Sequence, residues 1–262
     1  MSAGATAPFL RLRHVCLVAE DLGREAARIE SILGLEVCHR DPSVAKYGLA
    51  NALFPVGASF LEIVSPTRAG TAAGRFLERH RGKYGYMVIL DCDNPERYRR
   101  RAESLGVRVA NLIHCDAYFG VQLHPKDTGA AMLEFNSTAG GTDLWGPYWP
   151  AGPNWQRAIR RERTRAMAAV EIEAPDTDRL AERWASIMER PVQNLGDGKR
   201  RIALDAGTID ILPSTAHEAA FAGVNLEVAD RTDGIVDLCG VRFRLTSRPA
   251  PGGEGSGPPA SS

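Results

Sequence analysis

Three side chains that could do acid–base or metal chemistry stand alone inside apolar segments of the sequence. His14 lies in RHVCLVAE, Glu62 in SFLEIV and Glu134 in AAMLEF. A carboxylate in such a strand is costly unless a cation or a shared proton compensates its charge. If the strands share a sheet, His14, Glu62 and Glu134 could bind a metal as hard ligands. Otherwise, His14 is a core histidine bonded to a carbonyl, and the acids lie on a solvated strand face.

Glu134 belongs to the most informative stretch, residues 119–136, which reads FGVQLHPKDTGAAMLEFN. Its pattern predicts a hairpin: a strand to residue 124, a tight turn over residues 125–129 and a buried return strand over residues 130–135. In the turn, proline presets φ, aspartate bonds its own backbone and glycine supplies a positive φ.

Other polar residues could line a pocket beside these acids. Asn51 lies mid-strand between two alanines, where an amide usually needs a specific partner. Tyr86 is either core packing or a pocket donor, and His124 has a role in the turn or in the pocket. Arg13 and Lys126 could meet an anionic substrate or simply solvent. His114 could shuttle protons by its chemistry, or be merely exposed.

Composition excludes several classes of function. Lys plus Arg equals Asp plus Glu, at 32 each among 262 residues, so we expect neither nucleic acid nor a membrane as partner. The arginine-rich runs at 97–101 and 157–165 are interleaved with acids or apolar residues, which is typical of solvated helix faces. The N-terminal residues lack a secretory leader pattern. Five cysteines without a CxxC motif indicate free thiols and a cytoplasmic location.

Hydrophobic periodicity predicts two units of strand, helix and three strands between residues 10 and 136. The first comprises strand 10–19, helix 22–33 and strands 35–39, 47–54 and 59–64. A short helix, 71–80, is inserted before the second. The second comprises strand 84–92, helix 96–105 and strands 107–113, 118–124 and 130–135.

A weaker copy follows. HVCLVAEDLGREAARIESILGLEV aligns with AVEIEAPDTDRLAERWASIMERPV, and SFLEIV aligns with GTIDIL. His14 then corresponds to Ala169, and Glu62 to Asp210, so the copy repeats the scaffold without the ligands. The resulting organisation is a flexible tail (1–9), a domain with the site (10–136), a linker rich in Gly, Pro and Trp (137–164), degenerate module(s) (165–247) and a disordered tail (248–262). The tryptophans of the linker either join the halves or form a lid over a pocket.

These motifs resemble the vicinal oxygen chelate superfamily, which includes glyoxalase I, bleomycin-resistance proteins, extradiol dioxygenases and methylmalonyl-CoA epimerase. LHPKDTGAAMLEF is similar to the closing hairpin of the epimerases, and YGLANALFPVGASFLEIVSP to broader glyoxalase-like domains. The resemblance implies an α+β fold of tandem βαβββ modules forming half-open mixed β-sheets, with helices on the outer face. Modules of this superfamily often pair across subunits. Pairing within one chain is equally reasonable here, so the protein could be a monomer or a homodimer.

By this resemblance, His14, Glu62 and Glu134 take the first-, fourth- and eighth-strand positions that bind a divalent metal. At the fifth strand, Tyr86 and Met87 replace the family's histidines, and a thioether is a poor ligand for a hard ion. A metal (Mn, Co, Ni, Zn or Mg) is therefore possible, or the change at Met87 has abolished the site.

The resemblance implies three functions for a small-molecule substrate or ligand. The first is an isomerase, epimerase or lyase in which Glu62 or Glu134 moves a proton next to a carbonyl, with or without a metal-stabilised enolate. The second is a metal-free binding or resistance protein, with Asn51, Tyr86, Met87 and His124 as candidate pocket residues. An extradiol dioxygenase is a third hypothesis, against which the missing second histidine counts.

Overall fold

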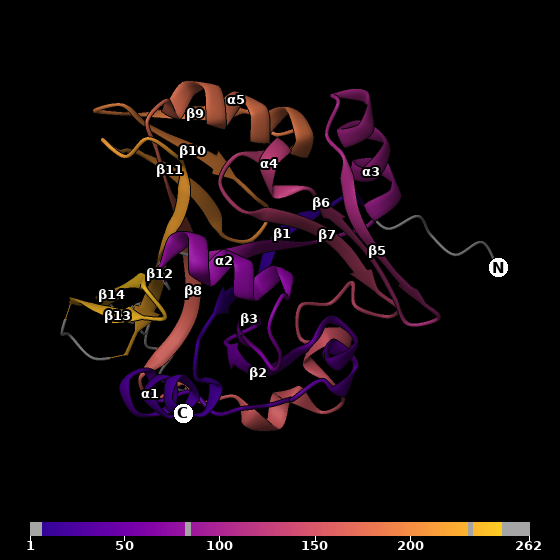
Figure 1. Cartoon of the computed structure of the whole chain (residues 1–262), viewed down its shortest axis with the longest axis vertical. Coiled ribbons are helices and arrows are strands. Elements are labelled where there is room, and N and C mark those ends of the chain that lie inside the picture. Colours follow the sequence, from indigo (N-terminus) through magenta and orange to yellow (C-terminus); the bar gives the residue numbers. More distant parts are fainter. Residues whose placement is uncertain (1–6, 82–84, 230–232, 248–262) are drawn as a thin grey trace, which may run out of the picture.

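The computed structural model describes residues 7–81, 85–229 and 233–247. Within these ranges the chain has an α+β fold in which fourteen strands form one mixed sheet (Figure 1). The first half contains β1 (Leu10–Val18), β2 (Leu49–Val56), β3 (Ser59–Pro66), β4 (Gly85–Cys92), β5 (Val109–Cys115), β6 (Tyr118–Leu123) and β7 (Met132–Thr138). The second half contains β8 (Thr164–Ala174), β9 (Val192–Gly196), β10 (Lys199–Ala203), β11 (Thr208–Pro213), β12 (Ala220–Val228), β13 (Gly234–Leu238) and β14 (Val241–Ser247).

The α-helices are α1 (Leu22–Leu33), α2 (Ala72–His80), α3 (Pro95–Ser104), α4 (Pro125–Thr128) and α5 (Thr177–Met188). Three 3-10 helices are η1 (Pro42–Tyr47), η2 (Trp149–Ala151) and η3 (Trp155–Ala158). The predicted tails fall largely outside the described residues, since 1–6 and 248–262 are not described. Among the described helices, none is both long enough and apolar enough to cross a membrane.

The paired units of the first half form a run of seven strands in the order β2-β3-β1-β4-β7-β6-β5. Its centre is the antiparallel pair β1–β4, which joins the two units. The second half repeats this plan in the order β9-β10-β11-β8-β12-β14-β13. The unit β12–β14 has no helix among its described residues, and it pairs with the unit that begins at β8 through β8 and β12. The modules therefore pair within the chain.

Helix α1 shows how the sequence pattern predicts the position and the ends of an element. Asp21 caps its first turn by accepting a hydrogen bond from the backbone N–H of Arg24 at 2.9 Å. Ile29 and Leu33 recur at helical spacing and are fully buried. Gly34 ends the helix with φ 66°, a left-handed conformation that favours glycine. The prediction of a helix over residues 22–33 is confirmed.

Two local predictions were wrong. The strand predicted over residues 35–39 is reduced to an isolated bridge between His39 and Leu53, because Asp41 and Pro42 start the 3-10 helix η1. The turn predicted over residues 125–129 is the short helix α4, in which proline occupies the first turn. Two strands of the second half, β9 and β13, were not predicted.

Helices α1, α3 and α5 lie on one face of the sheet and share a continuous hydrophobic core that includes residues from both halves. Helix α2 instead lies over β3, on the opposite face (Figure 1). Among the described residues, the two seven-stranded runs join at one β4–β12 residue pair, Gly85 with Phe221, and at an isolated bridge between Arg11 and Ala206. A Cβ atom added at Gly85 would lie 2.1 Å from the Phe221 ring, so this junction requires glycine.

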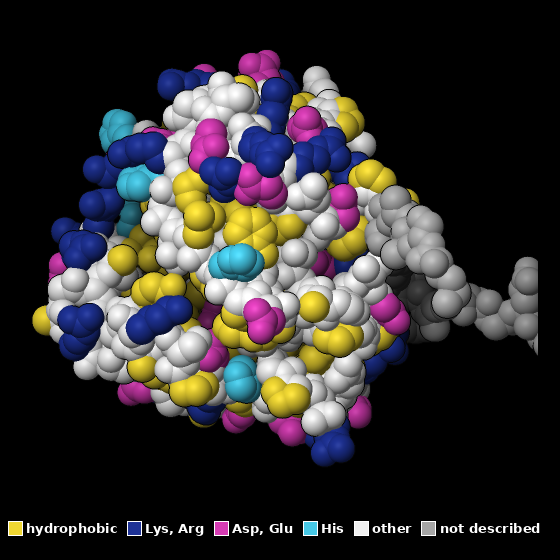
Figure 2. All heavy atoms as spheres, turned by 90° about the vertical axis from the view of Figure 1, so that its right-hand side faces the viewer, with side chains coloured by type: hydrophobic (Ala, Val, Ile, Leu, Met, Phe, Trp, Pro, Cys, Tyr) yellow, Lys and Arg dark blue, Asp and Glu magenta, His cyan; other side chains and the backbone are white. Residues whose placement is uncertain are grey.

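Three arginines of residues 97–101 form ion pairs along or beside α3, and Arg101 donates to the backbone carbonyl of Ser186. Arg99 contacts Glu96 at 2.6 Å and Glu103 at 2.8 Å, and Arg97 contacts Glu189 at 2.6 Å. Figure 2 shows both signs of charge intermingled at the top of the face where α3 lies. This arrangement is that of a solvated helix face.

Candidate functional site

The register of the first sheet brings the three predicted residues onto the face opposite α1 and α3. Cys16 of β1 pairs with Glu62 of β3 on one side and with Met87 of β4 on the other. His14 of β1 and Glu134 of β7 both pair with the same residue of β4. Since side chains two residues apart share a face, all five point to the same side of the sheet.

Two β-bulges add further side chains to this face. In the β1–β4 pair, the register shifts between Leu12 and His14, which leaves Arg13 as the extra residue. A second shift leaves Tyr86 as the extra residue of β4. A bulge re-aims a side chain that regular alternation would send to the other face. Arg13 therefore lies against the same aromatic rings as His14, and Tyr86 packs in the same cluster as Met87.

Glu62 has one fixed oxygen and one oxygen facing His14. Oε1 accepts a hydrogen bond from Nδ2 of Asn51 at 2.7 Å, and Oε2 lies 3.3 Å from Nε2 of His14. The other ring nitrogen of His14, Nδ1, lies 3.3 Å from the hydroxyl of Tyr148. Nε2 is buried and has no hydrogen-bond partner among the described residues, so it remains available to a ligand.

Glu134 is held more tightly. Its carboxylate accepts a short hydrogen bond from the hydroxyl of Tyr118, one from Nε2 of Gln122 at 2.7 Å and one from Nδ2 of Asn136 at 3.2 Å. Three donors thus fix both oxygens of this carboxylate. Glu134 is therefore held in one orientation, and only 3% of its surface is exposed.

The thiol of Cys16 lies close enough to Glu62 and Glu134 to be affected by the charge of each carboxylate. Burial, followed by the negative charges of Glu62 and Glu134, raises the pKa of Cys16 well above its usual value. Burial is also the main cause that raises the pKa values of Tyr118 and Tyr148 well above 10, followed for both by the charge of Glu134. All three groups are thus protonated at neutral pH.

Two elements cover this face. Phe76 and Leu77 of α2 pack over an apolar cluster that contains Cys16, Met87 and Ile89. The connecting segment, residues 139–163, covers the other end. Its residues Tyr148 and Trp155 pack with Phe60 and Leu53. Trp149 stacks on Tyr118, with ring centroids 5.0 Å apart. These aromatic residues cover one end of the site, and residues 139–163 are called the lid below.

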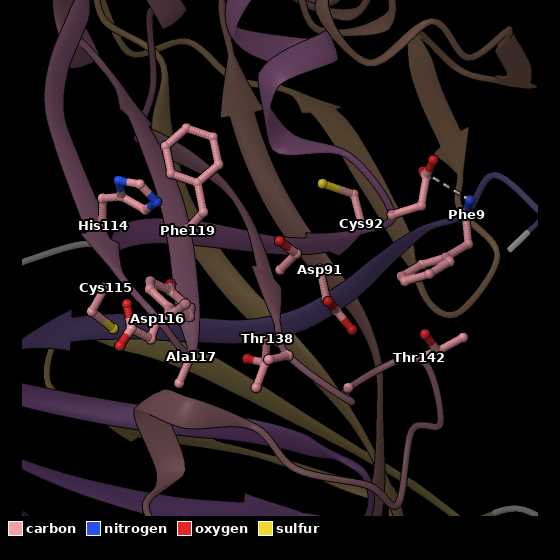
Figure 3. A pocket seen from close by; sticks show the side chains of 15 residues that line it. Phe9, Asp91, Cys92, His114, Cys115, Asp116, Ala117, Phe119, Thr138 and Thr142 are labelled. Atoms are coloured by element: carbon pink, nitrogen blue, oxygen red, sulfur yellow. Dashed lines mark hydrogen bonds between the residues drawn. The ribbon is translucent and has the colours of Figure 1, made fainter. Parts of the chain in front are cut away.

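Two cavities adjoin the lid. One, of about 630 Å³, is lined by Tyr148, Trp149 and Trp155 and extends to His39 and Asp41. The other, of about 340 Å³, is lined by Tyr118 together with residues of the β5–β6 turn (Figure 3). In Figure 3, His114 and Asp116 lie at one end of this cavity and Asp91 farther along. His114 is exposed and its ring packs against Phe119, so it is remote from Glu62.

The remaining predicted pocket residues differ in their placement. The hydroxyl of Tyr86 is buried beneath α2, which raises its pKa to about 12. Met87 pairs with Cys16 on the face of the sheet that carries the site, and Asn51 donates a hydrogen bond to Glu62. His124 is not brought to the cluster, because it caps α4 by accepting from the N–H of Lys126 at 3.2 Å.

The sequence interpretation missed five residues of the cluster, namely Cys16, Tyr118, Gln122, Asn136 and Tyr148. Gln122 and Asn136 could have been found, because hairpin register places Gln122 opposite Glu134 and Asn136 two residues farther along the same face. No signal in the sequence indicated Tyr148, which reaches His14 from 134 residues away.

The side chains do not fit a divalent metal as they are arranged. His14 Nε2 and Glu62 Oε2 could supply two ligands, but donors already engage the carboxylate of Glu134, and Met87 offers only a thioether. Across the described residues, no group of three His, Cys, Asp or Glu side chains is placed to hold one ion. We therefore assign no chemical step to a metal.

Comparison with known proteins places this geometry in a family. The model of the glyoxalase-like domain matches residues 12–188, more than half of the chain. The chain belongs to the glyoxalase-like domain family, within the vicinal oxygen chelate superfamily. Human mitochondrial methylmalonyl-CoA epimerase is 25% identical over 129 residues, which cover 47% of this chain and 72% of the epimerase.

Two solved structures share the fold of both halves. A hypothetical protein from Staphylococcus aureus has a TM-score of 0.71 and 13% identity, covering 91% of this chain and 100% of that one. The Mn(II)-bound glyoxalase from Novosphingobium aromaticivorans has a TM-score of 0.63 and 14% identity, covering 92% and 83%. The glyoxalase-like domain thus has the α+β fold that the sequence resemblance implied.

Proposed function

We propose that this glyoxalase-like protein is an isomerase or epimerase that moves a proton on the carbon next to a carbonyl, with Glu62 as the base. The main support for this proposal is that the two buried acids of the site, Glu62 and Glu134, differ in their hydrogen bonding. Apart from Asn51 on Oε1, the groups beside the Glu62 carboxylate are the His14 ring at 3.3 Å and the thiol of Cys16, which is a weak donor. Stronger neutral donors hold both oxygens of Glu134. The epimerase relative supports the same type of reaction at the level of the family.

Side chains of this chain can supply every proton donor and acceptor that the reaction needs. The C–H bond next to the carbonyl breaks, its proton forms an O–H bond on Glu62, and its electron pair becomes part of an enolate. The enolate oxygen then needs a hydrogen-bond donor. Once Glu62 has taken the proton, a protonated His14 Nε2, which lies 3.3 Å from Oε2 of Glu62, can donate to the enolate oxygen. Return of the proton to carbon regenerates Glu62.

The other residues position this pair. Asn51 fixes one oxygen of Glu62, and Tyr148 bonds to the far nitrogen of His14. Glu134, with Tyr118, Gln122 and Asn136, forms a rigid polar wall beside the reacting carbon. The lid and α2 exclude water, which strengthens each of these interactions.

The test is exchange of deuterium from D₂O into carbonyl compounds, followed by NMR across a panel of 2-oxo acids, 3-oxo acids and acyl thioesters. The variant Glu62→Gln keeps a carbonyl oxygen for Asn51 but lacks the base. We expect it to exchange about 10²- to 10⁴-fold more slowly than wild type. Asp210→Asn is the matched control, because Asp210 is the counterpart of Glu62 in the second half and Arg201 binds it at 2.6 and 2.7 Å. Equal exchange by Glu62→Gln and wild type would overturn the assignment.

A small-molecule binding protein is the second candidate function. Its support is the burial of the site under α2 and the lid, together with the cavity of about 630 Å³ lined by aromatic rings. Binding of a carbonyl compound without any deuterium exchange would favour this candidate over the enzyme.

A further inference from the structure

The feature that the proposed reaction leaves unused is a fully buried arginine with no acceptor. Arg13 has 0% of its surface exposed, so the expectation that it might simply meet solvent is wrong. Its Nε, Nη1 and Nη2 atoms have no hydrogen-bond partner, and it forms no ion pair, among the residues that the structure describes. A buried charge without a partner is strongly destabilising, so an arginine retained in this state calls for an explanation.

A second arginine on the same strand, Arg11, has acceptors for both of its terminal nitrogens, and only its Nε lacks a partner among the described residues. Arg11 donates to Asp91 at 2.5 Å and to the carbonyl oxygens of Thr142 and Gly141 at 2.8 and 3.2 Å. Asp91 is thereby engaged by Arg11. The guanidinium of Arg13 has aromatic faces around it instead.

The surroundings of Arg13 form a cage of three rings. Its guanidinium carbon lies 5.3 Å from the ring centroid of Phe60, 4.9 Å from that of Tyr148 and 5.8 Å from that of Trp155. Aromatic faces attract a cation, but they accept none of its five N–H bonds in the manner of an oxygen. The cage therefore orients the guanidinium and leaves its hydrogen-bonding edge unused.

The position of Arg13 links it to the proposed reaction. The bulge in β1 places it next to His14, and both residues contact Phe60 and Tyr148. Tyr148 and Trp155 also line the cavity of about 630 Å³. These two rings form a wall between that cavity and the guanidinium, so displacement of the lid would open a path from one to the other.

We infer that Arg13 binds an anionic group of the substrate, most suitably a carboxylate, next to the carbon whose proton Glu62 removes. The planar guanidinium can bind a carboxylate through two parallel N–H···O bonds, which fixes orientation as well as charge. The substrate would then be an oxo acid or a related carbonyl compound that carries an anion. This inference rests on the proposed function for its placement of the reacting carbon, but binding of the anion can be measured alone.

The test uses malonate, a dicarboxylate with an acidic carbon, and its neutral analogue malonamide, in calorimetric titrations of the full chain. We expect malonate to bind at least about tenfold more tightly than malonamide to wild type. Arg13→Met should remove this difference, and Arg13→Lys should reduce it because the two-point contact is lost. Arg244→Met is the control, because Arg244 is an exposed arginine on β14 of the second half. It should bind malonate as wild type does.

Equal binding of malonate and malonamide by wild type, or unchanged preference in Arg13→Met, would overturn the inference. If Arg13→Met does not fold, Arg13→Lys takes its place, and an unchanged preference for malonate in that variant would overturn the inference. A second readout is tryptophan fluorescence, which malonate should change as it displaces Trp155 from the guanidinium.

Malonate preference without deuterium exchange on any carbonyl compound would keep the anion site and reject the proposed reaction. Rapid exchange on neutral carbonyl compounds, with no preference for malonate, would keep the proposed reaction and reject the anion site.

Discussion

The hydroxyl of Tyr148 lies 3.3 Å from Nδ1 of His14, so a residue of the lid bonds directly to the strand that carries the site. The ring of Tyr148 also stacks on Phe60, with centroids 4.7 Å apart. The lid is therefore linked to His14, a residue of the proposed reaction, through the hydroxyl group of Tyr148. Whichever nitrogen of His14 carries its proton, Tyr148 helps to set the tautomer that faces Glu62.

Tyr148→Phe should separate these two contributions. The ring can keep its stacking, so we expect a loss of free energy of unfolding of only about 1 kcal/mol. Deuterium exchange should slow by about fivefold, which corresponds to a hydrogen bond of that strength, and its pH profile should change. The control is Tyr47→Phe at a partly exposed tyrosine. No change in either rate or pH profile would show that Tyr148 only packs.

Tyr118 provides a prediction for alkaline pH. Burial, together with the charge of Glu134, raises the pKa of Tyr118 well above the value of about 10 that it has in an unfolded chain. Above about pH 10 the unfolded state therefore loses this proton while the folded state keeps it. The stabilisation is complete below pH 10 and decreases as the pH rises, by up to about 1.4 kcal/mol per pH unit.

Tyr118→Phe should therefore have a shallower decline of stability at alkaline pH, measured by urea unfolding from about pH 9 to 11. Tyr148 and Cys16 also have raised pKa values and would maintain part of the slope. At neutral pH the variant should lose about 1–3 kcal/mol, because Glu134 loses one of its donors. An unchanged slope would mean that Tyr118 does not titrate with folding.

The junction of the halves depends on one glycine. Gly85→Ala would place a Cβ atom 2.1 Å from the ring of Phe221, so we expect a loss of about 1–3 kcal/mol in the free energy of unfolding. Gly234→Ala is the matched control, because nothing lies within 4 Å of the added atom. Phe221→Leu should partly rescue Gly85→Ala in a double-mutant cycle. Equal stability of the two alanine variants would contradict the close approach.

Much of the fold followed from local signals in the sequence. Asp21 and Gly34 marked both ends of α1, and alternation marked the strands that hold His14, Glu62 and Glu134. Pairing of these strands could be anticipated because the units repeat. The short strands β9 and β13 escaped notice, because exposed polar residues dominate β9 and only five residues form β13.

The site was less accessible to sequence reasoning for a physical reason. Regular alternation sends Arg13 to the face opposite His14, and only the bulge of β1 reverses this. Tyr148 comes from a segment without periodicity, so its position depends on tertiary packing alone. Glu134 was expected as a metal ligand by resemblance, whereas the register of its own hairpin already places Gln122 and Asn136 beside its carboxylate.

In the proposed reaction, Glu62 and His14 move a proton without a metal ion. The most direct test is deuterium exchange by protein purified without a metal-binding tag, with bound metal counted by elemental mass spectrometry before and after chelation. We predict that the chelated protein holds far less than one equivalent of divalent metal and exchanges as fast as before, whereas Glu62→Gln is slow in either state. Exchange that disappears on chelation and returns with Mn²⁺, Co²⁺, Ni²⁺ or Zn²⁺ would contradict the claim.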